Sequence, residues 1–371
     1  MGFYLHMPFC ETRCHFCSFN TAPFAHGALA RYLEAAHREI ALLATLPWAN
    51  AITIVSVFLG GGTPSLLPPG DVAALLDALG SRLRVADDAE VTLEANPESV
   101  SAEAFTGYRA AGVTRFSLGV QALDDAVLAR LGRRHNARDA RSAFEAARAA
   151  GADNVSIDLM YGLPGVDTGA WVRTMEQVLD WQPDHLSAYG LTLDAGSLWG
   201  AAGPPDLPSE AVVVEQYWAL ARAASGRGFE HYEISNYARP GFRSRHNQIY
   251  WRAAEYLACG PGACGFVGDV RYGNHKPVER YAGALASGSL PLDTWERLTS
   301  RQRQAERLIL GLRTLDGVPE AWLDERVAGD SRLERLVTRW EQGGWLRRGS
   351  GRVVLTESGF LLSDSLFVEL L

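Results

Sequence analysis

Residues 9–20 read Phe-Cys-Glu-Thr-Arg-Cys-His-Phe-Cys-Ser-Phe-Asn, a stretch that places three cysteines on one short segment. Cys10, Cys14 and Cys17 come directly after the first strand-like run, Phe3–His6, so we expect them on a loop. Closely spaced thiolates are typical of iron–sulfur or zinc sites. A structural zinc ion takes four ligands, and no second Cys or His pair stands at zinc-finger spacing, although two histidines lie close by. An iron–sulfur cube held by three cysteines leaves one iron open to another ligand.

Outward from this loop, apolar strand-like runs alternate with amphipathic helical stretches over about the first 235 residues. The predicted strands are Phe3–His6, Ile52–Leu59, Glu90–Glu94, Arg115–Leu118, Asn154–Leu159 and His185–Tyr189. The predicted helices are Ala28–Leu43, Val72–Leu83, Ala102–Ala111, Asp139–Ala150, Ala170–Leu179 and Glu210–Ser225. Such alternation implies crossover connections and a parallel sheet. Because six units are too few to close an eight-stranded barrel, the sequence predicts an α/β fold with a partial, open (β/α)6 barrel.

The pattern changes towards the C-terminus. Residues 232–273 are rich in glycine and aromatic residues and show little periodicity, and from residue 292 three helices precede two short strands. We therefore predict a barrel over residues 1–235, a connecting segment over 236–290, and a small winged-helix-like α+β domain over 291–371. This last domain holds 12 Arg and 13 acidic residues, a net charge of 12 − 13 = −1, which favours a docking or lid role over DNA binding.

Composition narrows the possible functions. The 371 residues carry a formal net charge of −8, which argues against a general nucleic-acid binder. No apolar run approaches the length of a membrane span, so we expect at most peripheral association with a membrane. The N-terminus lacks the basic and apolar regions of a signal peptide. Clustered cysteines without such a signal predict a reducing, cytoplasmic location.

A glycine-rich turn follows the second predicted strand. Residues 59–64 read Leu-Gly-Gly-Gly-Thr-Pro. Glycines let a backbone approach a ligand closely and leave N–H groups free to bind it, so Gly61, Gly62 and Thr63 are candidate ligand-binding residues.

Four polar residues stand where a barrel carries its chemistry, at or just beyond the C-terminal ends of strands. They are Glu94, Gln121, Arg133 and Asp158. Asp158 lies in an apolar run, where a carboxylate is costly unless it faces a ligand or partner. Any one of them alone is more often a strand cap or an ion-pair partner. Together, and in order along the chain, they favour a functional site.

The whole chain resembles the coproporphyrinogen III oxidase-like family of the radical S-adenosylmethionine (SAM) superfamily. The resemblance rests on Cys10–Asn20, the glycine turn, and the segments 93–97, 119–121 and 158–164. It implies a [4Fe-4S] cluster held by Cys10, Cys14 and Cys17 with one open iron. It also implies that SAM, as one molecule or two, contacts Tyr4, Phe16, Gly61, Gly62, Thr63, Glu94, Gln121, Arg133, Asp158 and Thr192.

Two features separate the branches of that family. The oxidase has a fourth cysteine two residues past the third and an N-terminal extension, whereas this chain has Phe19 there and begins nine residues before the first cysteine. Residues 245–251, Arg-His-Asn-Gln-Ile-Tyr-Trp, resemble the H-N-x-x-Y-W motif of the haem-chaperone branch. That resemblance implies haem binding by His246, Asn247, Tyr250 and Trp251.

The chemistry of this segment is compatible with haem. Imidazole is a common axial ligand, and aromatic rings offer flat apolar surface for a porphyrin. The arginines that could pair with propionates are Arg239, Arg243, Arg245 and Arg252. Cys264 stands where relatives usually have histidine, and it is either a soft haem ligand or a small apolar residue. Cys259 is interpreted as structural.

The leading hypothesis is therefore a haem chaperone that carries haem to client haemoproteins, and whether it forms a homodimer stays open. Coproporphyrinogen III dehydrogenase is the alternative enzyme, a radical SAM methyltransferase is a third, and whether the chain is an enzyme stays open. Because His246 lies beyond the sixth barrel unit, we expect the haem site to be separable from the cysteine loop.

Overall fold

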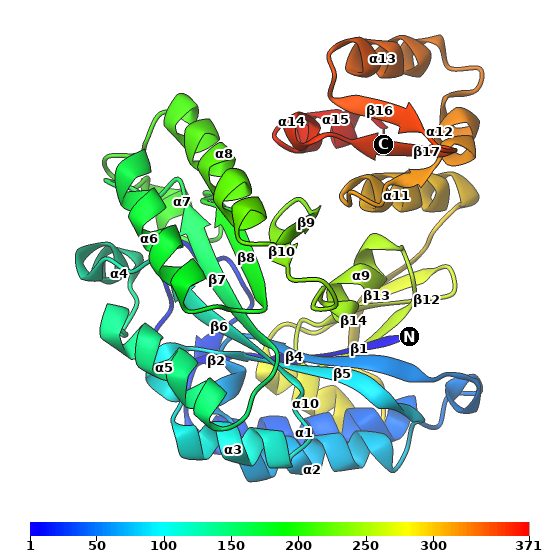
Figure 1. Cartoon of the computed structure of the whole chain (residues 1–371). Coiled ribbons are helices and arrows are strands. Elements are labelled where there is room, and N and C mark those ends of the chain that lie inside the picture. The colour runs from blue at the N-terminus through cyan, green and yellow to red at the C-terminus, as the bar shows by residue number, and fades with distance from the viewer. Residues whose placement is uncertain (371) are drawn as a thin grey trace.

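One mixed sheet runs through most of the chain and curves around an interior space (Figure 1). The computed structural model describes residues 1–370. Across the 12-stranded sheet the order is β14 (Leu292–Arg297), β13 (Val270–Asn274), β12 (Cys264–Val267), β11 (Tyr256–Cys259), β1 (Gly2–Met7), β4 (Ile54–Gly61), β5 (Val85–Ala95), β6 (Arg115–Gln121), β7 (Val155–Tyr161), β8 (His185–Gly190), β10 (Asn236–Ala238) and β9 (Glu230–Glu233).

The centre of this sheet is the predicted partial barrel. Strands β1, β4, β5, β6, β7 and β8 are all parallel, and each matches a strand predicted from the sequence. The six predicted helices are present as α1 (His26–Leu43), α2 (Pro69–Gly80), α3 (Ala102–Ala110), α5 (Ala137–Ala149), α6 (Thr168–Asp180) and α8 (Glu210–Gly226). They lie on the outer face of the sheet (Figure 1), so the predicted open α/β barrel is confirmed.

Alternation along the strands separates an apolar outer face from a polar inner face. In β6, Phe116 and Leu118 are fully buried in the core beneath the helices. Arg115 and Ser117 point the other way and line an interior cavity. Successive side chains of a strand face opposite sides, so the apolar set holds the helices while the polar set is left for function. Each apolar side chain buried in this way contributes about 1.5–3 kcal/mol.

The segment 236–290 adds strands on both sides of the parallel centre of the sheet. Strand β10 pairs with β8 at one edge, while β11 pairs in parallel with β1 at the other and leads into β12 and β13. These strands have three to five residues each, too few for a clear period of two, which is why the sequence showed little periodicity there.

Four helices within residues 1–290 were not predicted from the sequence, and three of them have only five to seven residues. They are α4 (Asp125–Leu131), α7 (Leu198–Ala202), α9 (Arg245–Trp251) and α10 (Val278–Ala286). Short 3-10 turns lie at Ala49–Ala51, Pro64–Leu66 and Pro97–Ser99. Two further strands, β2 (Phe9–Cys10) and β3 (Ala22–Pro23), pair with each other away from the large sheet.

A smaller α+β unit follows the large sheet. It contains α11 (Ser300–Leu312), β15 (Val318–Pro319), α12 (Glu320–Val327), α13 (Ser331–Gln342), β16 (Leu346–Gly349), β17 (Arg352–Leu355), α14 (Glu357–Phe360) and α15 (Ser363–Leu370). Its helices surround a three-stranded sheet of order β15-β17-β16 and enclose a core of their own, which includes Leu308, Trp340 and Val353. Tyr217 of α8 joins that core and donates a hydrogen bond to the Glu357 carbonyl.

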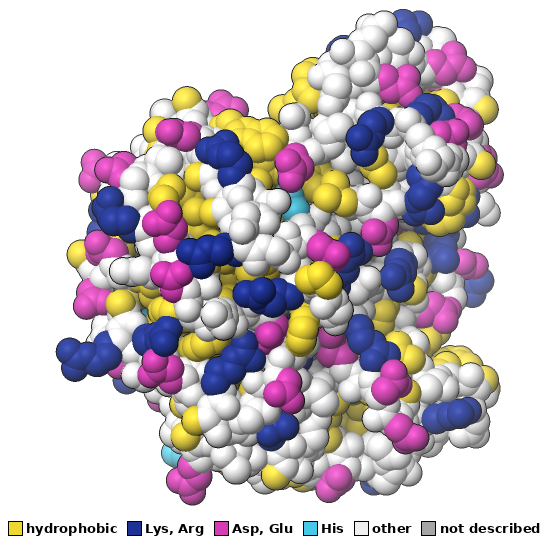
Figure 2. Space-filling model, viewed as in Figure 1, with side chains coloured by type: hydrophobic (Ala, Val, Ile, Leu, Met, Phe, Trp, Pro, Cys, Tyr) yellow, Lys and Arg dark blue, Asp and Glu magenta, His cyan; other side chains and the backbone are white. Residues whose placement is uncertain are grey.

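The unit stands beside α8 and above α9 (Figure 1), and the space-filling view shows a notch between it and the part of the molecule that carries α6 and α8 (Figure 2). Within the described residues, no helix is long and apolar enough to cross a membrane.

Candidate functional site

The cysteine loop is fastened at both ends. Strands β2 and β3 pair in parallel, and the Phe24 N–H donates to the Cys10 carbonyl at 3.0 Å. Midway, the His15 N–H bonds the Leu131 carbonyl at 2.9 Å. The three cysteines between these anchors are half-buried. The segment that carries the cysteines follows β1, as the sequence predicted, and these hydrogen bonds hold it against the barrel.

The sulfur atoms have polar neighbours from distant parts of the chain. Thr63 Oγ1 donates to Cys10 Sγ at 3.4 Å, and Arg133 Nη1 donates to Cys14 Sγ at 3.6 Å. Burial raises the pKa of the Cys10 and Cys17 thiols, and the charge of each neighbouring thiolate adds to that rise. Deprotonating this cluster of thiols therefore calls for a positively charged partner such as a metal centre.

The donor set fits a cluster better than a single ion. Among residues 1–370, no three Cys, His, Asp or Glu side chains converge as ligands of one metal ion, which zinc would require. In an iron–sulfur cube each thiolate binds a different iron, so the ligands need not converge on one point.

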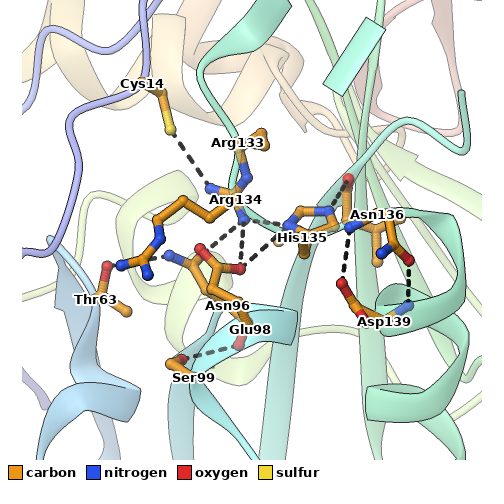
Figure 3. Close-up of polar contacts among 12 residues, drawn as sticks. Cys14, Thr63, Asn96, Glu98, Ser99, Arg133, Arg134, His135, Asn136 and Asp139 are labelled. Atoms are coloured by element: carbon orange, nitrogen blue, oxygen red, sulfur yellow. Dashed lines mark hydrogen bonds and ion pairs between the residues drawn. The ribbon is translucent and has the colours of Figure 1, made fainter. Parts of the chain in front are cut away.

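Arg133 connects the cysteine loop to the ends of β5 and β6 (Figure 3). Its Nη2 donates to Asn96 Oδ1 at 2.9 Å and to the Gly119 carbonyl at 2.7 Å. Asn96 Nδ2 in turn donates to Thr63 Oγ1 at 3.1 Å, and Thr63 donates to Cys10. A continuous hydrogen-bonded path thus links Cys14 to Cys10 through three side chains of the barrel.

Glu98 lies beside this hydrogen-bonded path and contacts Arg133. Its carboxylate lies 4.0 Å from Arg133 Nη2 and accepts a 3.2 Å hydrogen bond from His135 Nδ1. Burial alone would raise the pKa of Glu98, but the His135 hydrogen bond and the charge of Arg133 together hold it below its usual value. The ionised carboxylate orients the arginine towards the sulfur.

The glycine turn packs against the backbone that leads into the cysteine loop. The Gly62 N–H donates to the Met7 carbonyl at 2.7 Å, the Thr63 N–H to the Phe9 carbonyl at 2.9 Å, and the Gly61 N–H to Glu94 Oε2 at 3.0 Å. The expectation that these N–H groups are free for a ligand is therefore wrong. Glycine is required here by close approach, because a Cβ on Gly62 would lie 2.5 Å from the Phe9 carbonyl oxygen.

Beside the hydrogen-bonded path from Cys14 to Cys10, the barrel encloses a polar cavity of about 210 Å³. Its lining is formed by Tyr4, Phe58, Glu94, Arg115, Ser117, Asp158, Ser187, Tyr189, His246, Asn247 and Tyr250. Burial, and then the charge of Asp158, raise the pKa of Glu94 to about 8. Asp158 accepts hydrogen bonds from Ser117 at 3.0 and 3.1 Å. Three predicted SAM residues, Tyr4, Glu94 and Asp158, thus face one cavity.

Helix α9 closes the other side of that cavity. His246 is fully buried, with Nδ1 2.6 Å from Ser56 Oγ and Nε2 2.8 Å from Tyr250 Oη. Burial lowers its pKa to about 3, so the ring is neutral. Its ring centroid lies 6.5 Å from that of Tyr4. The cysteine loop does not line this cavity, whereas Tyr4, Glu94 and Asp158 do. That the haem site is separable from the cysteine loop stays a prediction.

Gln121, Phe16 and Thr192 are among the predicted SAM residues that lie outside the cavity. Gln121 ends β6 with a φ of 67°. Phe16 packs against the apolar cluster around Leu131 and Trp199. Thr192 is exposed on the loop after β8. The structure therefore brings Tyr4, Glu94 and Asp158 together and leaves Phe16 and Thr192 apart from them.

Known proteins match this chain along its length. The family model of the radical SAM superfamily matches residues 4–178. The heme chaperone HemW of Mycobacterium tuberculosis (strain H37Rv) is 39% identical over 376 residues, covering 100% of this chain and 94% of that protein. The chain belongs to the HemW family of radical SAM proteins. The heme chaperone HemW of Bacillus subtilis is 32% identical and covers 98% of this chain and 97% of its own length.

A solved structure supports the fold of this HemW-family chain. The coproporphyrinogen III oxidase HemN of Escherichia coli superposes with a TM-score of 0.86, covering 100% of this chain and 89% of that one at 22% identity. At this identity the likeness shows a shared fold. It confirms the radical SAM architecture with its C-terminal unit.

The arginines near the HNxxYW segment of this HemW-family chain are mostly engaged. Arg243 forms ion pairs with Glu230 and Asp316, and Arg245 pairs with Asp88. Arg239 donates to the Pro183 carbonyl, and Arg252 donates to the Gln248 side chain at 3.0 Å. Of the four candidates for propionate binding, Arg243 and Arg245 already have carboxylate partners.

The two remaining cysteines have different surroundings. Cys259 is fully buried beside Tyr281 and Glu39, which agrees with a structural role. Cys264 is exposed at the start of β12, where it is paired with Gly273 of β13.

Several residues of the site were missed at the sequence level. The tertiary structure brings Glu98 and His135 close to Arg133 and places Ser187 in the lining of the cavity. Arg115 and Ser117 carried a usable signal, since they alternate with Phe116 and Leu118 in one strand. Polar residues at every second position of a predicted barrel strand indicate side chains that face the interior.

Proposed function

We propose that this protein is a haem chaperone built on a radical SAM scaffold, which binds haem and passes it to client haemoproteins. The observation that carries the proposal is the end-to-end match to heme chaperones named HemW, at 39% identity over the whole chain. The cysteine loop, together with the hydrogen bonds that Arg133 donates to Cys14 and Asn96, supports the radical SAM part of the proposal.

In this proposal Cys10, Cys14 and Cys17 hold a [4Fe-4S] cluster. Bound there, the cluster supplies one-electron chemistry and an open iron for a further ligand. Arg133 donates a hydrogen bond to the Cys14 sulfur and so orients this ligand of the cluster. Tyr4, Phe16, Gly61, Gly62, Thr63, Glu94, Gln121, Arg133, Asp158 and Thr192 are the proposed SAM contacts. The support is strongest for Thr63 and Arg133, which hydrogen-bond cysteine sulfurs.

The proposed haem contacts are His246, Asn247, Tyr250 and Trp251 of α9. Both ring nitrogens of His246 are hydrogen-bonded, so an axial bond to iron requires Tyr250 or Ser56 to release one of them. Trp251 has a buried Nε1 without a hydrogen-bond partner in residues 1–370, and its ring lies 4.5 Å from the Arg313 guanidinium carbon. The segment therefore changes conformation when haem binds through the histidine.

The C-terminal unit is the proposed docking element for clients or for a second copy of the chain. In the division that we propose, it spans residues 291–371, after the barrel of 1–235 and the connecting segment of 236–290. A cytoplasmic location follows from the reducing conditions that clustered free thiols need. Nucleic acid is not a proposed partner, because the net charge is −8.

One experiment separates this function from the alternative of a coproporphyrinogen III dehydrogenase. The holoprotein, reconstituted without oxygen, is assayed in parallel for haem binding and for decarboxylation of coproporphyrinogen III. We expect haem binding without decarboxylation, since Phe19, 64% exposed beside the cysteine loop, replaces the oxidase's fourth cysteine. Decarboxylation at enzyme-like rates would refute the chaperone function.

A further inference from the structure

Arg115 is a buried cation without a partner among residues 1–370. It is 2% exposed at the start of β6 and points into the barrel cavity. Within residues 1–370 its guanidinium donates no hydrogen bond and forms no ion pair, and its Nε is shielded from solvent. An unpaired charge buried in this way is costly to folding, so its presence calls for a partner that the chain itself does not provide.

The groups around Arg115 do not neutralise it at close range. Glu94 and Asp158 are the carboxylates of the cavity, and each feels the positive charge without contacting it. His185 of β8 and His246 of α9 face Arg115. His185 is hydrogen-bonded to Ser156 and Tyr232. His246 is hydrogen-bonded to Ser56 and Tyr250. Burial lowers the pKa of both histidines, so both rings are neutral. Tyr4, Tyr189 and Tyr250 complete the walls as neutral phenols.

The cavity has room for part of a ligand. Its volume of about 210 Å³ is below the ~300–1,000 Å³ of pockets that enclose whole small molecules. Tyr189, 44% exposed, lies at its open side, and the half-buried side-chain amide of Asn247 has no hydrogen-bond partner in the described chain. An arm of a larger molecule can therefore enter while the rest stays outside.

We propose that Arg115 binds the carboxylate at the end of an alkyl arm that enters the barrel cavity from a larger ligand. The guanidinium fork matches a carboxylate bidentately, and the free Asn247 amide can add a third hydrogen bond. Burial raises the pKa of Glu94 to about 8, so this side chain is mostly protonated near neutral pH and does not repel the incoming anion.

Two ligands that the proposed function requires carry a carboxylate on an alkyl arm, so this inference rests on that function. Haem has propionates, and SAM has a methionyl carboxylate. The test compares each with an analogue that lacks the charge: haem with its dimethyl ester, and SAM with decarboxylated SAM. Dissociation constants are measured on the cluster-loaded protein without oxygen, for wild type and for Arg115→Met.

We expect Arg115→Met to weaken binding of one carboxylate ligand on the order of 10- to 100-fold and to leave its uncharged analogue unaffected. The ligand that loses affinity identifies the source of the arm. The melting temperature of the ligand-free variant should not fall, because the substitution removes an unpaired buried charge. Arg115→Lys keeps the charge without the fork and should weaken the same ligand less, which covers the case in which the methionine variant fails to fold.

Arg222→Met, an exposed arginine on α8, is the matched control and should change nothing. Wild-type protein that binds neither haem nor SAM would refute the proposed function. Wild-type protein that binds them, with no loss of either affinity in Arg115→Met and Arg115→Lys, would overturn only the assignment of Arg115.

Discussion

Arg133 Nη1 lies 3.6 Å from Cys14 Sγ although 119 residues separate the two in the chain. The contact depends on α4, which ends at Gly132 in the left-handed conformation with a φ of 76°. That turn reverses the chain and aims Arg133 back over the end of β6 towards the cysteine loop. The relationship defines the site better than any single residue, because it couples the loop to the barrel.

Arg133→Met should lower the reduction potential of the cluster without unfolding the barrel. Loss of a charge-assisted hydrogen bond to sulfur, worth ~1–2 kcal/mol, should shift the cluster potential by roughly 40–80 mV to more negative values. Redox titration of the reconstituted protein measures the shift. Arg138→Met, at an exposed position five residues further on, is the control and should leave the potential unchanged. An unchanged potential in Arg133→Met would mean that the contact with Cys14 has no electrostatic role.

Replacing Cys10, Cys14 and Cys17 together by Ala should abolish the absorbance near 400 nm and the bound iron. The helical content should persist, since these half-buried residues lie on a loop outside the core. Because the loop does not line the cavity under α9, the triple variant should still bind haem. Cys264→Ala should keep the cluster, and iron lost equally in that variant would contradict the assignment.

Glu94 should make the ligand-free protein less stable as pH rises. Its pKa is about 8 in the folded chain and 4.5 ordinarily, so the folded state holds the proton over that range while the unfolded state has lost it. The stabilisation is therefore fully present below about pH 4.5 and lost as pH rises through 8. Because Glu94 is partly exposed, we expect the free energy of unfolding to fall by only roughly 1–2 kcal/mol between pH 6 and 8.

Denaturant unfolding of wild type and Glu94→Gln at these two pH values isolates this contribution. The glutamine still accepts from the Gly61 N–H but does not titrate. Equal pH dependence in the two proteins would show that the carboxyl is ionised throughout.

Substitutions at His246 and Tyr250 should act on haem in opposite directions. His246→Ala should change or weaken the Soret band, whereas Tyr250→Phe should tighten haem binding by about fivefold. The second effect follows because Nε2 no longer gives up a hydrogen bond, worth ~1 kcal/mol, before it reaches iron. If His246→Ala leaves the spectrum unchanged, the axial ligand is elsewhere, and Cys264→Ala is the next variant to compare.

Gly61→Ala should destabilise the protein by about 2–4 kcal/mol, because the residue has a φ of 113° and a Cβ there would lie 2.5 Å from the His6 ring. Gly70→Ala in α2 provides the matched control. A Cβ at Gly70 meets nothing within 4 Å, so alanine there should stabilise the helix by up to about 1 kcal/mol. Thermal unfolding compares them, and equal midpoints would contradict the close approach.

The element pattern was predictable because it depends on local periodicity. Helix α13, Ser331–Gln342, is one of the three helices predicted after residue 292, since its apolar residues recur at helical spacing and Asp330 caps its start. Helix α9 was not predicted, because its seven residues span too few turns to show a period. The glycine turn was located correctly, but its N–H groups bond to the cysteine-loop backbone, which local sequence cannot show.

By itself, the sequence determined the cysteine loop, the alternating strands and helices, and the polar residues at strand ends, because each depends on the order of neighbouring residues. Only the tertiary structure decided that α9 closes the barrel beneath Glu94 and Asp158, that Arg133 reaches Cys14, and that Arg115 has no partner in the described part of the chain. These relationships join residues about 90 to 150 positions apart. Their distances are set by sheet register and by the crossover helices, and no local pattern encodes those.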